Sequence, residues 1–459
     1  MKLVVLGGGG VRSPFLAKSV VTKAKELGIN KVVFMDNESE KLRIYGGMAK
    51  HISNYIDDTI EFQLTTDAIE AVKDASFIIT TLRVGQDKGR VSDERIALKY
   101  NVLGQETTGA GGFAMSLRSI PALMEYCELI KQYAKKDAYV FNFTNPSGLV
   151  TQALRSAGYD NVYGICDGPS EFIKELQELL EVSQDEFSVE CFGLNHLSWF
   201  RKIMAKGVDK TEEVINNKET YIKTEEHLFD EELVKMQEML LNGYLYFYYH
   251  REKAFDCIQK SRKTRGETIL DINTRMNEKL FNIDVDQEFD KAFKIFLEHY
   301  YERENSYMAI ESGNVRAKQI DVPPVSEFIN QEDDGGYAGV ALNYIKAIQT
   351  GKEVEMVLSV PNNGSIEGLE DDDIIEITCK IDKDGAKPVK IGKVPELQMN
   401  LIRQVKLFER TTVEAIREKS IEKAIKALMV HPLVNSYSLA KALVHEYLDE
   451  YKEFVGEWR

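Results

Sequence analysis

The chain has 459 residues, of which 43% are hydrophobic and 29% charged, a composition typical of a globular protein with two or three domain-sized units. Its formal net charge of −16 argues against nucleic-acid binding, and it means that an anionic substrate would need a local cluster of basic residues. No apolar run approaches the ~20 residues that span a bilayer, and five widely spaced cysteines do not indicate a disulfide framework. A cytoplasmic protein without a membrane partner is therefore predicted.

The first 170 residues alternate apolar, strand-like runs with helical patterns. The runs cover residues 2–6, 31–36, 76–81 and 138–143. Continuous apolar strands separated by helices are typical of a parallel sheet that is buried on both faces. The pattern predicts an α/β fold, with a doubly wound, Rossmann-type NAD-binding domain over residues 1–170.

The pattern changes after residue 170. We expect a helix, a strand pair, aromatic-rich helices, short strands and a helical C-terminal stretch, in that order, over 171–180, 187–206, 211–301, 354–393 and 395–453. No linker-like composition separates the two parts. The sequence therefore predicts a mixed α+β domain over residues 171–459 that packs directly on the first domain.

A glycine-rich turn follows the first strand-like run. The segment from Gly7 to Arg12 has the first two glycines of a G-x-G-x-x-G pattern, with Arg12 in place of the last one. Gly7, Gly8 and Gly9 would let the backbone approach a pyrophosphate at a helix N-terminus. Asp36, which ends the next strand, would accept hydrogen bonds from ribose hydroxyls and would repel the extra phosphate of NADP. The segment thus favours NAD, and a tight turn with a capping Asp36 is the alternative.

Polar segments also follow the later strands of the predicted sheet. Arg83 and Arg90 come after the third run, a glycine-rich loop covers 104–112, and Asn145 follows the fourth run. Ligands of open α/β sheets bind outside the carboxyl ends of the strands, so these residues are candidates for ligand contacts. Taken singly, each is equally compatible with a helix cap or a solvated turn.

Cys166 and His196 each end a strand-like run beside a polar partner. A thiolate together with an imidazole suits a borderline divalent metal such as Mn, Fe, Co, Ni or Zn. The pair has no C-x-x-C or H-E-x-x-H spacing, so a buried core cysteine and a structural histidine remain the alternative.

The sequence does not decide whether two downstream segments are structural or bind a ligand. Residues 242–249 form an aromatic block, most of which is expected to be core. Residues 261–267 are basic, and this pattern fits either an anion contact or a solvated helix face.

Taken together, these segments resemble the NAD- and metal-dependent glycoside hydrolase family 4, especially its 6-phospho-glucosidase members. The resemblance covers essentially the whole chain. Its motifs are the glycine turn with Ser13-Pro14, R-V-G to L-K-Y (83–100), G-Q-E-T-T-G (104–109), T-N-P (144–146), C-D-x-P (166–169), L-N-H (194–196) and H-P-L-V (431–434).

The resemblance implies roles for individual residues. Cys166 and His196 would bind a divalent metal, with Mn²⁺ favoured. Tyr244 would remove a proton from the sugar C2, Glu106 would tune that tyrosine and Asp167 would act as the acid. The phenol pKa of the base, ~10 in water, is expected to fall toward neutrality beside the metal. The implied substrate contacts are Ser13 (at the phosphate), Arg90, Asn145 and Arg265, and the implied cofactor contacts are Gly7, Gly8, Gly9, Asp36 and Arg83.

The resemblance also implies a redox-elimination route, in which NAD takes a hydride from the sugar and later returns it, so that no net oxidation results. A 6-phospho-β-glucosidase is favoured. A 6-phospho-α-glucosidase, or an α-galactosidase or galacturonidase acting on an unphosphorylated substrate, stays an alternative, because Asp167 is typical of the α-type members whereas 112–113 and 117–121 resemble the β-type. A malate- or lactate-type NAD-dependent dehydrogenase is a more distant alternative. The expected assembly is a homodimer or homotetramer.

Overall fold

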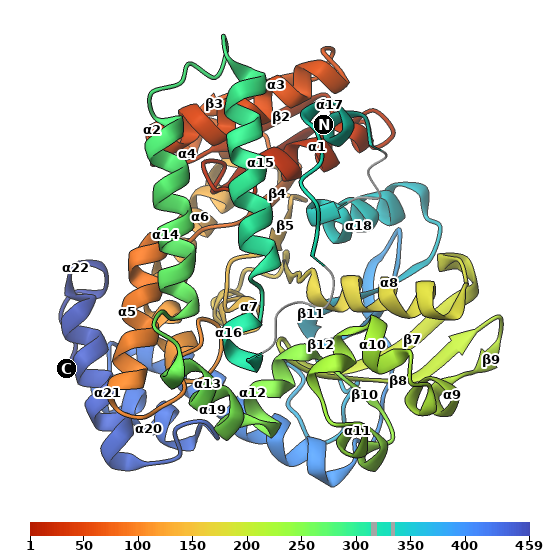
Figure 1. The fold of residues 1–459 in the computed structure, drawn as a ribbon, viewed down its shortest axis with the longest axis vertical. Coiled ribbons are helices and arrows are strands. Elements are labelled where there is room, and N and C mark those ends of the chain that lie inside the picture. Colours follow the sequence, from red (N-terminus) through yellow and green to blue (C-terminus); the bar gives the residue numbers. More distant parts are fainter. Residues whose placement is uncertain (314–318, 332–335) are drawn as a thin grey trace.

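The computed structural model describes residues 1–313, 319–331 and 336–459, with the side chain of Tyr337 excepted. Its described strands form one sheet of thirteen strands that runs through the molecule (Figure 1). Among the described residues, no helix is both long and apolar enough to cross a membrane.

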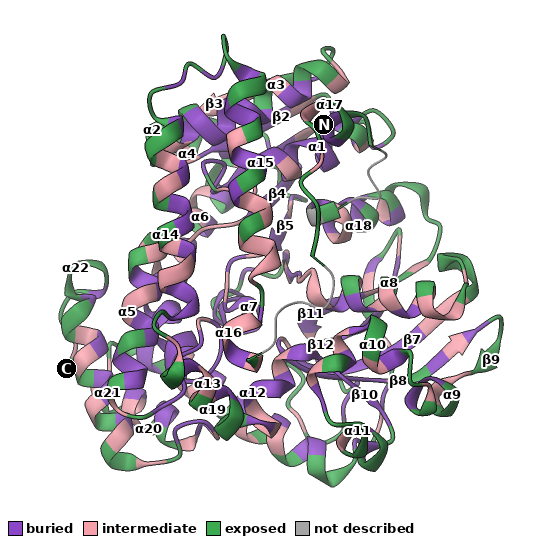
Figure 2. Ribbon diagram, in the orientation of Figure 1, coloured by how far each residue is buried: buried purple, intermediate pink, exposed green. Residues whose placement is uncertain are grey.

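Six parallel strands form the first half of the sheet, in the order β3-β2-β1-β4-β5-β6. This is the strand order of a Rossmann fold, so the predicted fold class is confirmed. Successive side chains of β1, β2 and β4 are buried on both faces of the sheet (Figure 2), as expected for apolar parallel strands. The strands are β1 Lys2–Leu6, β2 Lys31–Met35, β3 Glu61–Thr65, β4 Phe77–Thr80, β5 Tyr139–Asn142 and β6 Val162–Gly164.

Antiparallel strands continue the same sheet in the order β6-β11-β12-β7-β8-β10, with β13 paired to β12 and β9 paired to β8. They are β7 Phe187–Leu194, β8 Leu197–Ala205, β9 Val208–Asp209, β10 Leu240–Leu241, β11 Val354–Pro361, β12 Ile374–Asp382 and β13 Gly385–Pro388. The two halves meet where Gly164 pairs with Ser359. A Cβ atom on Gly164 would lie 2.6 Å from the Ser359 Cβ, so this junction requires glycine. The sheet is continuous across residue 170, and the division into 1–170 and 171–459 stays a prediction.

Helices connect the strands of the first half. They are α1 Ser13–Ala24, α2 Ser39–Lys41, α3 Gly47–Ile56, α4 Ala68–Val72, α5 Gln86–Lys99, α6 Gly109–Tyr133, α7 Ser147–Ser156 and α8 Gly168–Leu180. Those of the second half are α9 Thr211–Asn216, α10 Thr220–Lys223, α11 Glu231–Gln237, α12 Tyr246–Tyr249, α13 Arg251–Lys260, α14 Arg265–Leu280, α15 Phe289–Asn305, α16 Ala309–Ser312, α17 Val325–Asn330, α18 Gly339–Thr350, α19 Glu396–Glu418, α20 Ile421–Val430, α21 Tyr437–Glu450 and α22 Lys452–Val455.

The helix pair α14–α15 packs on the first half of the chain and brings two arginines toward the site. Its apolar side chains, including Phe293 and Phe296, form a core cluster with Tyr45 and Met48. The basic segment 261–267 contains the start of α14, where the side chains of Thr264 and Glu267 each accept the other's backbone N–H in a capping box. Arg265 begins this helix and is buried, so the segment is not a solvated helix face at that position.

Candidate active site

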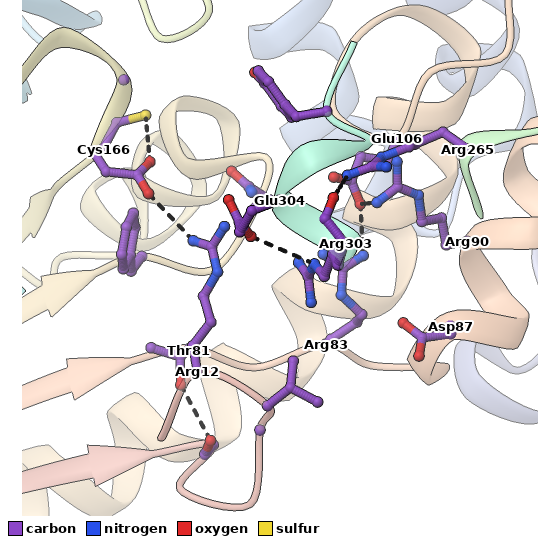
Figure 3. Close-up of a pocket in the computed structure, with 18 of the residues that line it drawn as sticks. Arg12, Thr81, Arg83, Asp87, Arg90, Glu106, Cys166, Arg265, Arg303 and Glu304 are labelled. Atoms are coloured by element: carbon purple, nitrogen blue, oxygen red, sulfur yellow. Dashed lines mark hydrogen bonds and ion pairs between the residues drawn. The ribbon is translucent and has the colours of Figure 1, made fainter. Parts of the chain in front are cut away.

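A cavity of about 1530 Å³ lies at the carboxyl ends of the parallel strands (Figure 3). The residues that follow β1, β2, β4, β5 and β6 contribute to its lining, as expected for an open α/β sheet. The cavity brings together the predicted residues Gly7, Gly9, Ser13, Asp36, Arg83, Arg90, Glu106, Asn145, Cys166, Asp167, His196, Tyr244 and Arg265.

The glycine turn packs tightly against β2. Gly7 has a φ of +99°, and the N–H groups of Gly7 and Gly8 both donate to the Met35 carbonyl, at 2.9 and 2.8 Å. Gly8 does not line the cavity, because its Cα lies against Phe34, where a Cβ would come within 2.6 Å. The Gly8 position therefore serves strand packing, and its contact with a cofactor stays a prediction.

Asp36 is held by the backbone of the turn that it faces. Its carboxylate accepts hydrogen bonds from the N–H of Gly9 at 2.9 Å and of Glu38 at 3.0 Å. Burial raises the pKa of Asp36 despite these hydrogen bonds. The side chain lines the cavity beside the start of α1, which is where the sequence pattern predicts the ribose of a dinucleotide.

Cys166 and His196 converge from β6 and from the turn between β7 and β8. The Cys166 Sγ lies 3.6 Å from the His196 Nε2. Two ligands at ~2.3 Å (S) and ~2.1 Å (N) from one tetrahedral ion are separated by about this distance. The spacing therefore fits two ligands of a single divalent metal. Among the described residues, no group of three or more His, Cys, Asp or Glu side chains forms a further metal-ligand cluster.

The hydrogen bond at the Nδ1 of His196 directs its Nε2 toward the Cys166 Sγ, the other proposed metal ligand. The Thr107 hydroxyl donates to the Gln105 Oε1 at 3.0 Å, so its oxygen accepts from the His196 Nδ1, also at 3.0 Å. Burial lowers the pKa of His196 to about 4, which keeps the ring neutral near pH 7. Burial also raises the pKa of the Cys166 thiol, and a bound cation would favour the thiolate instead.

Tyr244 stacks on His196, with ring centroids 3.8 Å apart and planes tilted by 3°. Its position is set by the Asn242 side chain, which accepts the Tyr244 N–H at 3.0 Å and starts the turn. Within 242–249, Tyr244 is the tyrosine that lines the cavity. Tyr248 instead hydrogen-bonds Thr108, and Tyr249 donates to Gln237.

Taken together, the protein groups around Tyr244 raise its pKa. Burial, followed by the Glu106 carboxylate, raises the pKa of this phenol. The fall toward neutrality is predicted for a Tyr244 beside a bound metal and stays a prediction, and within the polypeptide the Glu106 charge acts in the opposite direction.

Glu106 links the two arginines that follow β4. One carboxylate oxygen lies 2.6 Å from the Arg83 Nη1 and 3.0 Å from the Arg90 Nη1 (Figure 3). Burial would raise the pKa of Glu106, but the charges of Arg83 and Arg90 outweigh burial and hold it well below the usual range. Arg90 also pairs with Glu94 at 2.8 Å. Glu106 is thus an ionised group that orients two guanidinium groups toward the cavity.

Arg265 and Arg303 add positive charge to the same part of the cavity. Arg265 donates to the Ser306 hydroxyl and, at 3.0 Å, to the Arg303 carbonyl (Figure 3). Burial and the nearby Arg90 charge lower the pKa of Arg265 to about 10, which leaves it charged at pH 7. This is the local basic cluster that an anionic substrate needs on a chain of net charge −16.

Asp167 lies on the other side of the cavity, directly after Cys166. Its carboxylate forms an ion pair with Arg12 at 3.2 Å (Figure 3). Ser13, which follows Arg12 in the chain, is buried at the first turn of α1. Asn145 lines the cavity after β5. Asp167 (the predicted acid), Ser13 (the predicted phosphate contact) and Asn145 (a predicted substrate contact) thus line the same cavity as Tyr244.

Comparison with known proteins places this arrangement in a family. The model of the family 4 glycosyl hydrolases matches residues 2–182, and the model of the family 4 glycosyl hydrolase C-terminal domain matches residues 191–434. The chain belongs to the family 4 glycosyl hydrolases. It is thus an O-glycosyl hydrolase.

Several 6-phospho-glucosidases are similar to this chain over its full length. The 6-phospho-beta-glucosidase of Thermotoga maritima is 30% identical, with 99% of each chain covered. Its structure with manganese, NAD⁺ and glucose-6-phosphate has a TM-score of 0.81, at 29% identity and 99% coverage of each chain. A 6-phospho-alpha-glucosidase from gut microorganisms, solved with NAD and glucose-6-phosphate, also has a TM-score of 0.81, at 26% identity, covering 100% of this chain and 99% of that one.

The dehydrogenase alternative has support only at the level of fold. The malate dehydrogenase of Plasmodium falciparum is 13% identical to this glycosyl hydrolase, with a TM-score of 0.50, 94% of this chain covered and 99% of that one. This similarity shows a shared fold.

Sequence reasoning assigned no role to several groups of this family 4 site. Arg12 stands where the glycine pattern has its last glycine, and it pairs with Asp167. Thr107 lies in the glycine-rich loop, and the contact with His196 is between residues 89 positions apart. Arg303 and Tyr307 come from the end of α15 and the turn after it, where no local motif marks a site.

Proposed function

We propose that this enzyme hydrolyses glucosides that carry a phosphate on the sugar C6, with NAD and a divalent metal, Mn²⁺ being favoured. The proposal rests on residues that line one cavity. They are the pair Cys166 and His196, the stacked Tyr244, Arg90 and Arg265, and the glycine turn at Gly7 together with Asp36. Two relatives solved with NAD and glucose-6-phosphate, one of them also with manganese, support the same ligands here.

The proposed cofactors would supply a hydride acceptor and a Lewis acid when bound. Cys166 and His196 would hold the metal, and the cofactor would lie along the wall made by Gly7, Gly9, Asp36 and Arg83. Tyr244, stacked on a metal ligand, would take the proton from the sugar C2.

Asp167 would give a proton to the leaving oxygen. It follows Cys166 directly in the chain, so a sugar held at the metal site would have this carboxyl beside it. Because the ion pair with Arg12 requires the carboxylate form, Asp167 would first take up a proton from solvent before giving it to the leaving oxygen.

The substrate phosphate would lie among the arginines. Arg90 and Arg265 are both charged and nearly buried, so their contact with a phosphate would be strong. Glu106 would keep Arg83 and Arg90 apart and oriented. Ser13, the other predicted phosphate contact, lines the cavity on the side opposite these arginines, so its role at the phosphate stays a prediction, and Asn145 would complete the substrate contacts.

The test is an assay of p-nitrophenyl glucosides, α and β, with and without a 6-phosphate, supplied with NAD and Mn²⁺ under reducing conditions. We expect the β-linked 6-phosphate to be cleaved fastest, because relatives at 30% identity are 6-phospho-beta-glucosidases. Faster cleavage of the α-linked 6-phosphate would move the assignment to the α-type relatives. Equal kcat/KM with and without phosphate would remove the phosphate assignment.

We further propose a homodimer or homotetramer in the cytoplasm. All five cysteines are unpaired, two of them half-buried, which suits a reducing compartment. Light scattering after size-exclusion chromatography measures the assembly directly, and a monomer of 52.2 kDa would contradict the oligomer.

A further inference from the structure

The segment 83–90, which runs from the loop after β4 into the start of α5, lines the cavity and carries Arg83 and Arg90. Its backbone is held from behind by Arg118 of α6, whose side chain is 2% exposed. The Arg118 Nε donates to the Val84 carbonyl at 3.1 Å. A Cβ atom on Gly85 or Gly89 would lie 3.0 or 3.2 Å from this guanidinium, so both positions bring backbone against it.

Arg118 is in turn fixed by Asp93 and by the C-terminal helices. Its two Nη atoms donate to the Asp93 carboxylate at 2.8 and 2.7 Å. The guanidinium carbon lies 3.9 Å from the centre of the Tyr451 ring. The Tyr451 hydroxyl lies 2.9 Å from the Gly89 carbonyl and 2.5 Å from the Asp93 carboxylate, so its hydrogen is shared between them.

The elements that provide this contact are α21, α22 and the residue between them. Tyr447 of α21 donates to the Asp93 backbone carbonyl at 2.9 Å, and Phe454 of α22 lines the cavity itself. The match to the family 4 C-terminal model ends at residue 434, before α21 begins. This contact with the cavity wall therefore comes from a part of the chain outside the matched range.

We propose that the C-terminal helix pair α21–α22 sets the positions of Arg83 and Arg90, with Tyr451 as the positioning residue. Tyr451 touches the Gly89 carbonyl, which immediately precedes Arg90, and Arg118 ties the other end of the segment at Val84. The C-terminal helices thereby govern how well the enzyme binds the anionic end of its substrate. This inference rests on the proposed function, in which these arginines face a sugar phosphate.

The first test is Tyr451→Phe, which keeps the ring over Arg118 and removes only the hydroxyl. We expect KM for the phosphorylated glucoside to rise about tenfold, as for the loss of one hydrogen bond near a charged group. KM for the unphosphorylated glucoside and kcat should change by less than about threefold. Tyr437→Phe, an exposed tyrosine on α21, is the matched control and should match the wild type.

The second test uses the wild-type enzyme, so it does not depend on the variant's folding. Hydrogen–deuterium exchange is measured with and without glucose 6-phosphate, in the presence of NAD and Mn²⁺. Since coupling between sites is reciprocal, the ligand should slow exchange in 83–90 and also in 447–455.

The outcomes distinguish the positioning role of Tyr451 from the phosphate assignment. Protection of 83–90 without protection of 447–455, or a Tyr451→Phe variant with wild-type KM and only a lower Tm, overturns the positioning role alone. No protection of 83–90 by glucose 6-phosphate overturns the phosphate assignment, and the positioning role with it.

Discussion

Tyr244 is distinguished from its neighbours by what its ring touches. The sequence presents four tyrosines in 242–249 with equivalent local context. The fold turns one of them onto His196 and directs the hydroxyl groups of Tyr248 and Tyr249 to Thr108 and Gln237. The choice among these tyrosines is therefore made by tertiary contacts.

Replacing Tyr244 by Phe removes the hydroxyl that is proposed to take the C2 proton while keeping the ring on His196. We expect turnover to fall about 10²–10⁴-fold, the range for loss of a general base, with NAD affinity unchanged. Tyr249→Phe, in the same block but outside the cavity, is the control and should retain activity. Product formed in deuterated water should carry deuterium at C2, and a C2 that stays protiated would reject the elimination route.

Buried histidines make the stability of the fold sensitive to acid. Burial lowers the pKa of His196 to about 4 and of His431 to about 3, both below the ~6.5 of an unfolded chain. The His431 Nδ1 accepts the Leu433 N–H at 3.2 Å, a bond that protonation would break. Because the unfolded chain then binds more protons, stability is complete above ~pH 6.5 and is lost as pH falls toward these folded values.

We therefore expect the free energy of unfolding to gain a pH dependence of ~1.4 kcal/mol per unit from His431 between ~pH 6 and 4. Urea unfolding of wild type and His431→Asn across this range measures it, because the difference between the two should change with this slope. The exposed His445→Asn is the control. A pH-independent difference for the His431 variant would contradict the buried neutral ring.

At the level of elements, the loop 104–108 holds His196, which lies in the turn of the distant β7–β8 hairpin. Thr107 fixes the ring of His196 through its hydroxyl, and β7–β8 turns at His196 with a φ of +62°. The orientation of the proposed metal ligand thus depends on two segments that sequence analysis treats separately.

Thr107→Val keeps the shape of the side chain and removes the acceptor for the His196 Nδ1–H. We expect Mn²⁺ affinity to drop 10–100-fold, as for other groups that orient metal ligands. Thr107→Ser keeps the hydroxyl and should stay close to wild type. Calorimetric titration with Mn²⁺ gives the affinities, and equal values for Val and wild type would remove this role.

The sequence predicts the buried apolar strands, including the run 138–143 (β5), and also the strand pair 187–206 (β7 and β8). The apolar runs at 2–6, 31–36 and 76–81 became β1, β2 and β4, since a strand covered on both faces has no polar alternation to confuse it. β3 was missed because Glu61–Thr65 is an edge strand with a polar, partly exposed pattern. Arg303 was missed because its position depends on how α15 packs, which no local motif shows.

At the scale of the whole molecule, the cavity has walls from both halves of the chain. Gly9 and Asp36 come from the first strands, whereas Tyr244 and Arg265 come from beyond residue 240. A ligand that fills the cavity should therefore hold the two halves together as well as take part in the reaction.

Removing either proposed cofactor should abolish glycoside cleavage. Chelator treatment should be reversed by Mn²⁺, and removal of nucleotide should be reversed by NAD, as measured by release of p-nitrophenol. NAD at a hundredfold excess over its Kd should add ~2.7 kcal/mol to stability, visible as a higher Tm. Cleavage that continues after either treatment would contradict the proposed mechanism.

The single sheet also determines whether the two parts of this enzyme can be expressed as separate fragments. The two family matches leave 183–190 between them, which marks an obvious place to cut the gene. A fragment ending at residue 182 would leave β6 without β11, exposing an unpaired strand edge of the kind that promotes aggregation. We expect this fragment to be insoluble alone and rescued by co-expression with 183–459, as seen in soluble yield. For protein engineering the two halves are therefore not interchangeable modules, since each supplies the neighbouring strand that the other needs to stay in solution.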